Sequence, residues 1–329
     1  MVPTIRDVAK RAGVSISTVS RVLNGSASVH EEKKARVRAA ADELGYRPNP
    51  AALSLLGQRV GGVGVLLPYI AGDIFSEFLS GIDRITSQQG RFLMVSSSHR
   101  NDAEFRAVLR GLERRVDGLI VMSTEFPAET VRAWLPADLP LVFANTEVHD
   151  PEITAVNADN RGGAFRMTEH LVERGHRQIA FLKGPDGTYD AEERLTGFRE
   201  GLAAHGLEPV LELPCDFTLE CGEDTVPAIL AADPRPTAVF AANDDSAFGL
   251  LTGLREAGLR VPEDIAIAGV DDSKFSQLAI PSLTTVRMPM RQMGRTAIER
   301  LLAEIDGTNG GSHGLTVLPT ELVLRQSTA

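Results

Sequence analysis

Cysteine is scarce in this 329-residue chain, and its scarcity limits the kinds of site the chain can hold. The two cysteines, Cys215 and Cys221, are too few for a disulfide framework. Their C-x5-C spacing has no histidine nearby and does not match a zinc site. We therefore expect two ordinary reduced side chains and no bound metal.

Long apolar runs and catalytic signatures are also missing. No apolar stretch could span a bilayer, and no apolar run follows Met1 as in a signal peptide, so we expect a soluble cytoplasmic protein. The chain has no phosphate-binding G-x-x-x-x-G-K-[ST] loop, no G-x-S-x-G nucleophile elbow and no H-E-x-x-H metal motif. With no nucleophile or acid–base set in view, we expect no enzyme activity and no cofactor.

Basic residues are in the minority, 34 against 44 acidic ones, and the net charge of −10 alone argues against nucleic acid. Their distribution reverses that argument. Residues 1–60 hold ten basic and five acidic residues, which leaves 24 basic and 39 acidic residues for 61–329. A segment of charge +5 on a body of charge −15 concentrates the attraction for a polyanion at one end.

The segment 4–24 predicts two short helices joined by a tight turn. Apolar residues recur at helical spacing in both: Ile5, Val8, Ala9 and Ala12, then Val19, Val22 and Leu23. Thr4 and Ser15 suit N-caps, and Gly13 suits the end of the first helix. The other face of the second helix carries Ile16, Ser17, Thr18, Ser20 and Arg21. Short polar groups and one cation can enter a DNA major groove, which predicts a helix-turn-helix with 15–23 as its recognition helix.

A third helix is expected over 28–45, and it would complete a small headpiece. The next segment, 47–59, contains two prolines and then Leu53, Leu55 and Leu56. A helix this short is marginal alone, so it would form only against a partner such as DNA and a second copy of itself. A plain linker is the alternative, although a linker does not need three leucines.

From residue 60 onward, short apolar runs alternate with helical segments, which predicts parallel βαβ units and enough material for two α/β lobes. The expected strands are 63–67, 92–95, 118–122, 141–144, 178–182, 238–241, 265–268 and 315–318. The expected helices are 77–89, 104–114, 163–174, 192–205, 221–232, 246–257 and 290–305.

Polar residues gather where these strands end, which is where open α/β sheets bind ligands. Asn243 and Asp271 follow two strands, and Arg194 follows a third. An amide, a carboxylate and a guanidinium suit a small hydroxylated ligand. The alternative is structural: Asp244, Asp245 and Asp272 could cap helices, and Arg194 could pair with a carboxylate. For the acidic residues that alternative is at least as strong; for Asn243, Asp271 and Arg194 together we favour a ligand.

The chain resembles the lactose-repressor/galactose-repressor family over nearly its whole length. The motifs that carry the resemblance are residues 4–15, 18–24, 43–49, 116–120, 159–160, 170–171, 174–177, 194–198, 242–244, 269–272 and 281–286. The resemblance implies a headpiece (1–46), a hinge (47–59) and a periplasmic-binding-protein-like body (60–329). It places one lobe at about 60–157 and 287–313, and the other at about 158–286 and 314–329.

The resemblance also implies a homodimer on a pseudo-palindromic double-stranded operator. Ile16, Ser17 and Arg21 occupy base-reading positions, and Leu55 matches a hinge leucine that wedges into the minor groove. Leu53 departs from the arginine that many relatives carry there. The full set expected at DNA is Thr4, Ser15, Ile16, Ser17, Thr18, Ser20, Arg21, Asn24 and Leu55.

In the body, Arg194, Asn243 and Asp271 match effector-contacting positions, and Phe75 matches an apolar wall of the cleft. Asp190 and Asn157 lie at positions that vary with the ligand. Thr188 and Asp190 differ from the pair in a purine-sensing relative, which makes a sugar or polyol the expected effector. These features predict a ligand-gated transcriptional regulator, most simply a repressor. The alternatives are a solute-binding protein for sugar transport, or an enzyme on the same scaffold.

Overall fold

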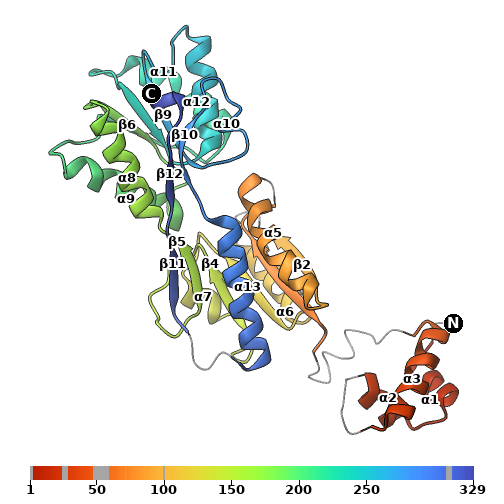
Figure 1. The fold of residues 1–329 in the computed structure, drawn as a ribbon. Helices are drawn as coiled ribbons and strands as arrows, with labels where there is room; N and C mark the ends of the chain where they lie inside the picture. The colour runs from red at the N-terminus through yellow and green to blue at the C-terminus, as the bar shows by residue number, and fades with distance from the viewer. Residues whose placement is uncertain (1–2, 24–28, 47–58, 71, 99–100, 309–312) are drawn as a thin grey trace. The chain divides into compact units, whose positions relative to one another are not determined.

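The computed structural model describes residues 3–23, 29–46, 59–70, 72–98, 101–308 and 313–329. The chain divides into two compact units, residues 1–60 and 61–329 (Figure 1). None of the described helices combines the length and apolarity needed to cross a membrane.

The described part of the first unit contains the helices α1 (Ile5–Ala12), α2 (Ile16–Leu23) and α3 (Glu31–Leu44). Gly13 ends α1 in the left-handed conformation, at a φ of +64° that favours glycine. The turn to α2 is therefore short, and the predicted helix-turn-helix is confirmed. The three helices bury one small cluster of apolar side chains: Val8, Ala9, Ala12, Val19, Val22, Val37, Ala40 and Ala41.

The first lobe of the second unit is built on a six-stranded parallel sheet in the order β11-β5-β4-β3-β1-β2. Its strands are β1 (Gly62–Leu67), β2 (Phe92–Ser97), β3 (Gly118–Met122), β4 (Leu141–Ala144), β5 (Ala155–Ala158) and β11 (Leu315–Leu318). Its helices are α5 (Asp73–Gln88), α6 (Asp102–Glu113), α7 (Ala128–Arg132) and α13 (Met290–Asp306).

The second lobe repeats the design, with the sheet order β12-β10-β9-β8-β6-β7. Only β12, at the edge, runs antiparallel to its neighbour. The strands are β6 (Ile179–Leu182), β7 (Leu211–Leu213), β8 (Ala238–Ala241), β9 (Ala266–Asp271), β10 (Thr284–Arg287) and β12 (Glu321–Val323). The helices are α8 (Asn160–Glu173), α9 (Tyr189–Ala203), α10 (Leu219–Asp224), α11 (Val226–Ala231), α12 (Asp244–Glu256) and the 3-10 turn η1 (Gln326–Thr328). Two doubly wound parallel sheets confirm the predicted fold class.

The chain passes between the lobes three times: after β5, after β10 and after β11 (Figure 1). One predicted boundary was wrong. Residues 314–329 were expected in the second lobe, but β11 pairs in parallel with β5 of the first. Only the segment from β12 onward joins the second lobe. A four-residue strand carries no signal that tells which of two similar sheets it will pair with.

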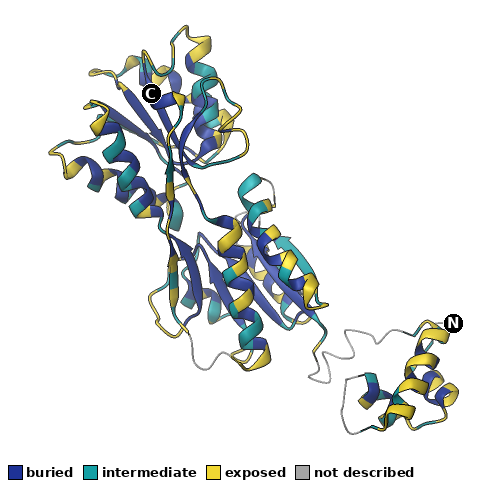
Figure 2. Cartoon of the chain, viewed as in Figure 1, coloured by how far each residue is buried: buried dark blue, intermediate teal, exposed yellow. Residues whose placement is uncertain are grey.

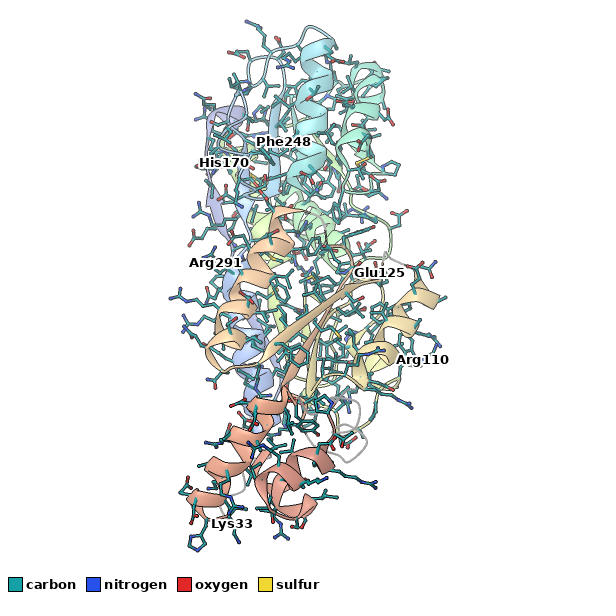
Figure 3. The ribbon with its side chains drawn as sticks, turned by 90° about the vertical axis from the view of Figure 1, so that its right-hand side faces the viewer. Lys33, Arg110, Glu125, His170, Phe248 and Arg291 are labelled. Carbon is teal, nitrogen blue, oxygen red and sulfur yellow. A yellow bond between two sulfur atoms is a disulfide. The ribbon has the colours of Figure 1, made fainter. Side chains whose placement is uncertain are left out.

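The central strands of each sheet are buried on both faces, as the dark strands in Figure 2 show, whereas the edge strands are partly exposed. In the first lobe α5 and α13 pack together on one face. Their backbones approach closely, since a side chain at Gly81 would collide with the backbone of Arg291 and one at Gly294 with that of Phe78. An ion pair of 2.8 Å between Arg291 and Glu77 joins the same two helices. Arg291 is labelled in Figure 3. Helix α13, distant in sequence, is thereby fixed into the first lobe.

Candidate functional sites

Helix α2 divides into a buried face and an exposed face, as its sequence predicts. Val19 and Val22 are buried, whereas Ser17 and Arg21 are exposed and Ile16 keeps 46% of its surface exposed. Thr18 and Ser20 lie at the border and are half-buried. An exposed isoleucine at the start of a helix offers an apolar surface to an external partner, which is the behaviour expected of a base-reading position.

The first turn of α2 carries linked hydroxyl groups. The Ser15 Oγ accepts the backbone N–H of Thr18 at 3.2 Å and lies 2.9 Å from the hydroxyls of Ser17 and Thr18. This capped N-terminus suits a phosphate oxygen. Thr4 is used differently: its N–H and hydroxyl both donate to the Asp7 carboxylate, at 2.9 and 2.7 Å.

The cations of the helical unit differ in their partners. Arg11 pairs with Glu43 at 2.7 Å, and Arg36 donates to the carbonyls of Ala12 and Gly13. Within the described part of the chain, the side chain of Arg21 forms no ion pair or hydrogen bond. Its guanidinium therefore remains for a base edge or a phosphate. Asn24 and Leu55, and with Leu55 nearly the whole predicted hinge, lie outside the described residues.

In the second unit, a cavity of about 790 Å³ is lined by both lobes. The first lobe contributes the segment after β1 with the start of α5, together with Thr124 after β3. The second lobe contributes residues that follow β6, β7, β8 and β9. Because the carboxyl ends of both parallel sheets open toward one space, side chains far apart in sequence meet there.

Among the described residues, Arg194 is the only cation lining this cavity, and its side chain is firmly held. It is 3% exposed, its Nε donates to Asn160 Oδ1 at 2.9 Å, and its Nη1 donates to the Ala242 carbonyl at 2.7 Å. Its Nη2 lies 3.9 Å from Asp271 Oδ1. The guanidinium therefore has a fixed position and one side still facing a carboxylate.

Asp271 ends β9 and lines the cavity. Its Oδ1 is buried and has no hydrogen-bond partner within the part of the chain that the structure describes. Burial raises the pKa of this carboxyl well above its usual value, and Arg194 opposes the rise. A buried carboxylate oxygen without a donor is costly, so a ligand that supplies a hydroxyl or amine donor would be stabilised here.

The structure brings five of the six predicted effector residues to this cavity: Phe75, Asp190, Arg194, Asn243 and Asp271. Asn243 also caps α12, because its Oδ1 accepts the Ser246 N–H at 3.1 Å while its Nδ2 donates to the Phe217 carbonyl at 2.9 Å. One N–H of its amide remains for a ligand.

Asn157 differs from the expectation. It lines a smaller neighbouring cavity of about 330 Å³, not the larger one. Its amide is bonded to both backbone groups of Thr146, at 3.1 and 2.7 Å, and to the Tyr189 hydroxyl at 3.2 Å. The side chain thus fastens the end of β5 to the start of α9.

Two of the acidic residues have structural roles, but neither caps a helix as the alternative supposed, since the N-cap of α12 is Asn243. Asp244 is buried and accepts from Ser273, Ser276 and Thr285, while burial raises its pKa to about 6. Asp272 pairs with Arg287 at 2.7 Å and with Arg325 at 2.5 Å. Asp245, in contrast, lines the cavity, and burial raises its pKa.

Sequence reasoning missed several cavity residues, chiefly Phe217 and its neighbours Asp216 and Thr218. They follow β7, a strand of only three residues that shows no recognisable pattern. Phe275, which follows β9, was also missed.

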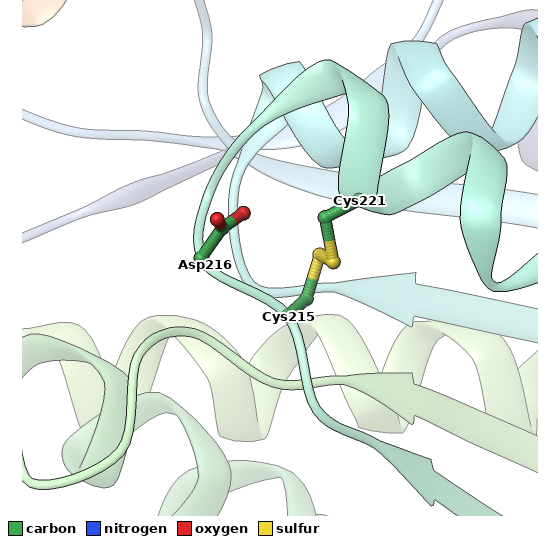
Figure 4. Close-up of side chains that lie close together, drawn as sticks. All are labelled: Cys215, Asp216 and Cys221. Atoms are coloured by element: carbon green, nitrogen blue, oxygen red, sulfur yellow. A yellow bond between two sulfur atoms is a disulfide. The ribbon is translucent and has the colours of Figure 1, made fainter.

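The cysteines were predicted to be reduced, and that prediction was wrong for this structure. Cys215 and Cys221 form a disulfide, with Asp216 beside them (Figure 4). Their separation of six residues brings the two Cα atoms within 5.6 Å because the chain turns sharply between β7 and α10. As a disulfide, the two sulfur atoms do not offer thiolates to a metal.

Known proteins match both units. Residues 4–49 match the family of bacterial regulatory proteins called the lacI family, and residues 168–328 match a periplasmic binding protein-like domain. Catabolite control protein A of Priestia megaterium is 33% identical over 330 residues, covering 99% of each chain. The chain belongs to the lacI family of bacterial regulatory proteins.

Other lacI-family proteins are similar over the same length. The HTH-type transcriptional repressor PurR of Pectobacterium carotovorum is 35% identical, over 99% of this chain and 97% of that protein. The structure of a Lac repressor dimer bound to operator and the anti-inducer ONPF matches with a TM-score of 0.85 and 33% identity, over 100% of this chain and 99% of that one. A CelR–cellobiose complex matches with a TM-score of 0.76 and 33% identity, over 99% of both.

This lacI-family chain is a DNA-binding transcriptional regulator. Its relatives match headpiece and body together and are named as regulators, which disfavours the alternative of a transport solute-binding protein. These relatives are repressors and control proteins and are not enzymes.

Proposed function

We propose that this regulator is a homodimeric repressor whose operator affinity is set by a neutral carbohydrate or polyol bound between its lobes. The observation that carries the proposal is the buried Oδ1 of Asp271, which has no hydrogen-bond partner among the described residues, beside the fixed guanidinium of Arg194. Together they offer an acceptor and a donor at one point of a cavity that both lobes line, which suits the paired hydroxyls of a sugar.

The charge of the cavity supports a neutral ligand. Its described lining includes five carboxylates, and Lys and Arg contribute only Arg194. An anionic ligand would meet net repulsion there, whereas hydroxyl groups can donate to carboxylates. The ring of Phe217 and that of Phe75 add apolar surface for a sugar ring face. A related regulator, CelR, is in complex with cellobiose, which agrees with this ligand class.

For the DNA contact, we assign base reading to Ile16, Ser17 and Arg21. The support is their exposure on one face of α2 and the absence of a described partner for Arg21. We place Ser15 and Thr18 at a phosphate because their hydroxyls lie at the N-terminus of that helix. The Lac repressor, whose structure this chain resembles, is bound to an operator as a dimer.

For the dimer, an exposed apolar segment of the second lobe is the candidate contact. Phe275, Leu278 and Ile280 follow β9 and are 62%, 68% and 85% exposed. Three large apolar side chains this exposed in one short segment are typical of an interface. An Ile280→Lys variant should shift the chain from dimer to monomer in sedimentation equilibrium, and an unchanged dimer would remove this segment from the contact.

The coupling between ligand and DNA lies in the lobe arrangement. The lobes are joined across the cavity by the Lys274 N–H, which donates to Asp73 at 3.2 Å, and beside it by the Tyr189 N–H, which donates to Thr124 at 2.9 Å. A ligand touching both lobes favours one arrangement of them, and its effect on operator affinity cannot exceed its preference for that arrangement. We expect the ligand to release DNA.

The experiment has two arms on the purified full chain. Selection from a random duplex library should yield a pseudo-palindromic sequence. A thermal-shift screen with glucose, galactose, ribose, cellobiose, lactose, glycerol and hypoxanthine should give a stabilising carbohydrate or polyol. That compound should weaken binding to the selected duplex and be recovered chemically unchanged, as expected of a non-enzyme. Failure to select any duplex, or stabilisation by hypoxanthine alone, would refute the corresponding half of the proposal.

A further inference from the structure

The disulfide described above closes a loop that forms one wall of the ligand cavity. Cys215 and Cys221 flank this loop between β7 and α10 (Figure 4). Three residues inside the loop, Asp216, Phe217 and Thr218, line the cavity. The chain contains no other cysteine. A covalent bond in this second lobe therefore has a direct connection to the ligand site.

Phe217 links the disulfide loop to the other residues of the cavity. Its backbone has a φ of +70°, a conformation that a non-glycine residue keeps only when its surroundings hold it. Its carbonyl accepts the Asn243 Nδ2–H at 2.9 Å, and its ring lies 5.7 Å from the Arg194 guanidinium carbon. The ring also packs so tightly on Gly184 that a β-carbon there would collide with it. Loss of the disulfide would free one end of this arrangement.

We propose that Cys215 and Cys221 are a reversible thiol–disulfide site that sets how firmly the Phe217 wall is held, and thereby how tightly the cavity binds its ligand. The effect on ligand affinity rests on the proposed function of the cavity. The effect on the mobility of the loop that carries Phe217 does not depend on that function.

The geometry gives a reductant access. A surface hollow of about 510 Å³ is lined by Cys215, Cys221 and their neighbours. Cys221 is half-buried and Cys215 is 8% exposed, so Cys221 is the more accessible of the two cysteines. The thiolate of a small dithiol forms a bond to Cys221 Sγ, the disulfide bond breaks, and Cys215 leaves as a thiolate that takes up a proton.

The second thiolate of the reductant then attacks its own sulfur in the mixed disulfide and releases Cys221, which is protonated in turn. The protein gains two electrons and two protons, and the dithiol becomes a cyclic disulfide. Oxidised glutathione reverses the reaction, and two molecules of reduced glutathione leave. In the dithiol form the Cys221 thiol has an acceptor nearby, because Pro214 O lies 3.7 Å from its sulfur.

Reduction should loosen the wall without unfolding the lobe. The Asn243–Phe217 hydrogen bond remains, and so do the bonds from the Thr218 N–H and hydroxyl to Asp216, at 3.1 and 2.6 Å. These contacts are non-covalent and can open locally, so the expected change is in the mobility of the loop.

The test compares the full chain oxidised with glutathione disulfide and reduced with dithiothreitol. Mass analysis after alkylation should count no free thiol in the first sample and two in the second. Hydrogen–deuterium exchange at residues 215–221 should be about tenfold faster after reduction. Exchange in β3, in the other lobe, should not change. A Cys215→Ser/Cys221→Ser variant should match the reduced chain and should not respond to dithiothreitol.

Two results would overturn the effect of the disulfide on the loop: two alkylated cysteines after treatment with glutathione disulfide, or equal exchange of 215–221 in both forms. The carbohydrate screen repeated on both forms should show a larger thermal shift for the oxidised chain. If no carbohydrate shifts either form, the proposed ligand class is refuted. The exchange measurement then still tests whether the disulfide holds the loop 215–221. If a carbohydrate shifts both forms equally, the link between disulfide and ligand is refuted.

Discussion

The helical unit and the two-lobed unit hold their functional side chains in opposite ways. In the first, Ile16, Ser17 and Arg21 stand on one exposed face of one helix, above a core of small side chains. In the second, Arg194 and Asp271 are almost fully enclosed, and residues from six strand ends must converge before the cavity exists. DNA is large and meets a surface, whereas a small ligand must be surrounded to exchange its bonds with water for bonds with protein.

The charges of the two units differ in the same sense. The first sixty residues carry a surplus of five positive charges, and the remainder a surplus of fifteen negative ones. The helical unit therefore attracts a polyanion over a distance, while the acidic cavity selects a neutral ligand by contact. The two binding activities should therefore respond to different variables, and four measurements test this.

Salt should produce the largest difference. Operator affinity should fall roughly a thousandfold or more between about 50 and about 200 mM salt. Binding releases counterions from the DNA phosphates, and this release is less favourable at higher salt concentration. Carbohydrate affinity should change by less than about twofold, since the ligand is neutral and screening acts on exposed charges. Fluorescence anisotropy with the selected duplex and calorimetry with the carbohydrate measure the two. A carbohydrate affinity that followed salt as steeply would contradict the division.

Asp271→Ala should come next. Loss of the carboxylate removes a charge-assisted acceptor, so carbohydrate affinity should fall roughly 10- to 100-fold. DNA binding without carbohydrate should stay as in the wild type. Asp186→Ala is the matched control, because its carboxylate belongs to the same lobe but is 82% exposed. An equal loss in both variants would show that the effect is one of general charge, not of the cavity.

Arg21→Ala should have the reciprocal effect. Removal of a base-reading guanidinium should weaken operator binding by about 5- to 100-fold and reduce the preference for the selected sequence. Carbohydrate affinity should not change. Arg38→Ala removes the same charge from an exposed position on α3 and should leave sequence preference intact. A joint loss of DNA and carbohydrate binding in Arg21→Ala would argue against separate units.

Acid should give the smallest effect, with opposite signs in the two units. Burial raises the folded-state pKa of Asp244 to about 6, against 3.8 for an unperturbed aspartate. The folded body therefore takes up the proton first, and this carboxyl makes unfolding costlier by about 1 kcal/mol as pH falls from about 7 to about 5. In the helical unit, hydrogen bonds from Thr4 lower the pKa of Asp7. The ionised Asp7 carboxylate therefore stabilises the folded unit at neutral pH, and this stabilisation is lost as pH falls through and below the usual aspartate range.

Urea unfolding followed by Trp134, the only tryptophan of the chain, reports on the body alone. The free energy of unfolding should depend less on pH in Asp244→Asn, because an amide does not titrate. The amide oxygen can still accept from the Ser273 N–H and the Ser276 hydroxyl, and the Thr285 hydroxyl can turn to accept from the amide nitrogen. The same pH dependence in variant and wild type would assign the effect to other groups.

Local patterns made much of the molecule predictable. The helix-turn-helix follows from caps, Gly13 and one apolar repeat within twenty residues, all of which act between near neighbours in the chain. The α/β class follows from alternating strands and helices. Among cavity residues, Arg194, Asn243 and Asp271 were found because they follow strands that are clear in the sequence. Phe217 was missed because β7 has three residues, and Asn157 was misplaced because nothing local shows that its amide binds Thr146 and Tyr189.

Short-range periodicity and turn chemistry are thus enough to predict the three described helices of the first unit, the two α/β lobes and the exposed face of α2. Three features could be seen only in the folded chain: the sheet that β11 joins, the disulfide between Cys215 and Cys221, and the enclosure of Asp271. Each of these depends on which distant segments come together, and that choice is made by packing of the whole lobe rather than by the residues next to one another in the chain.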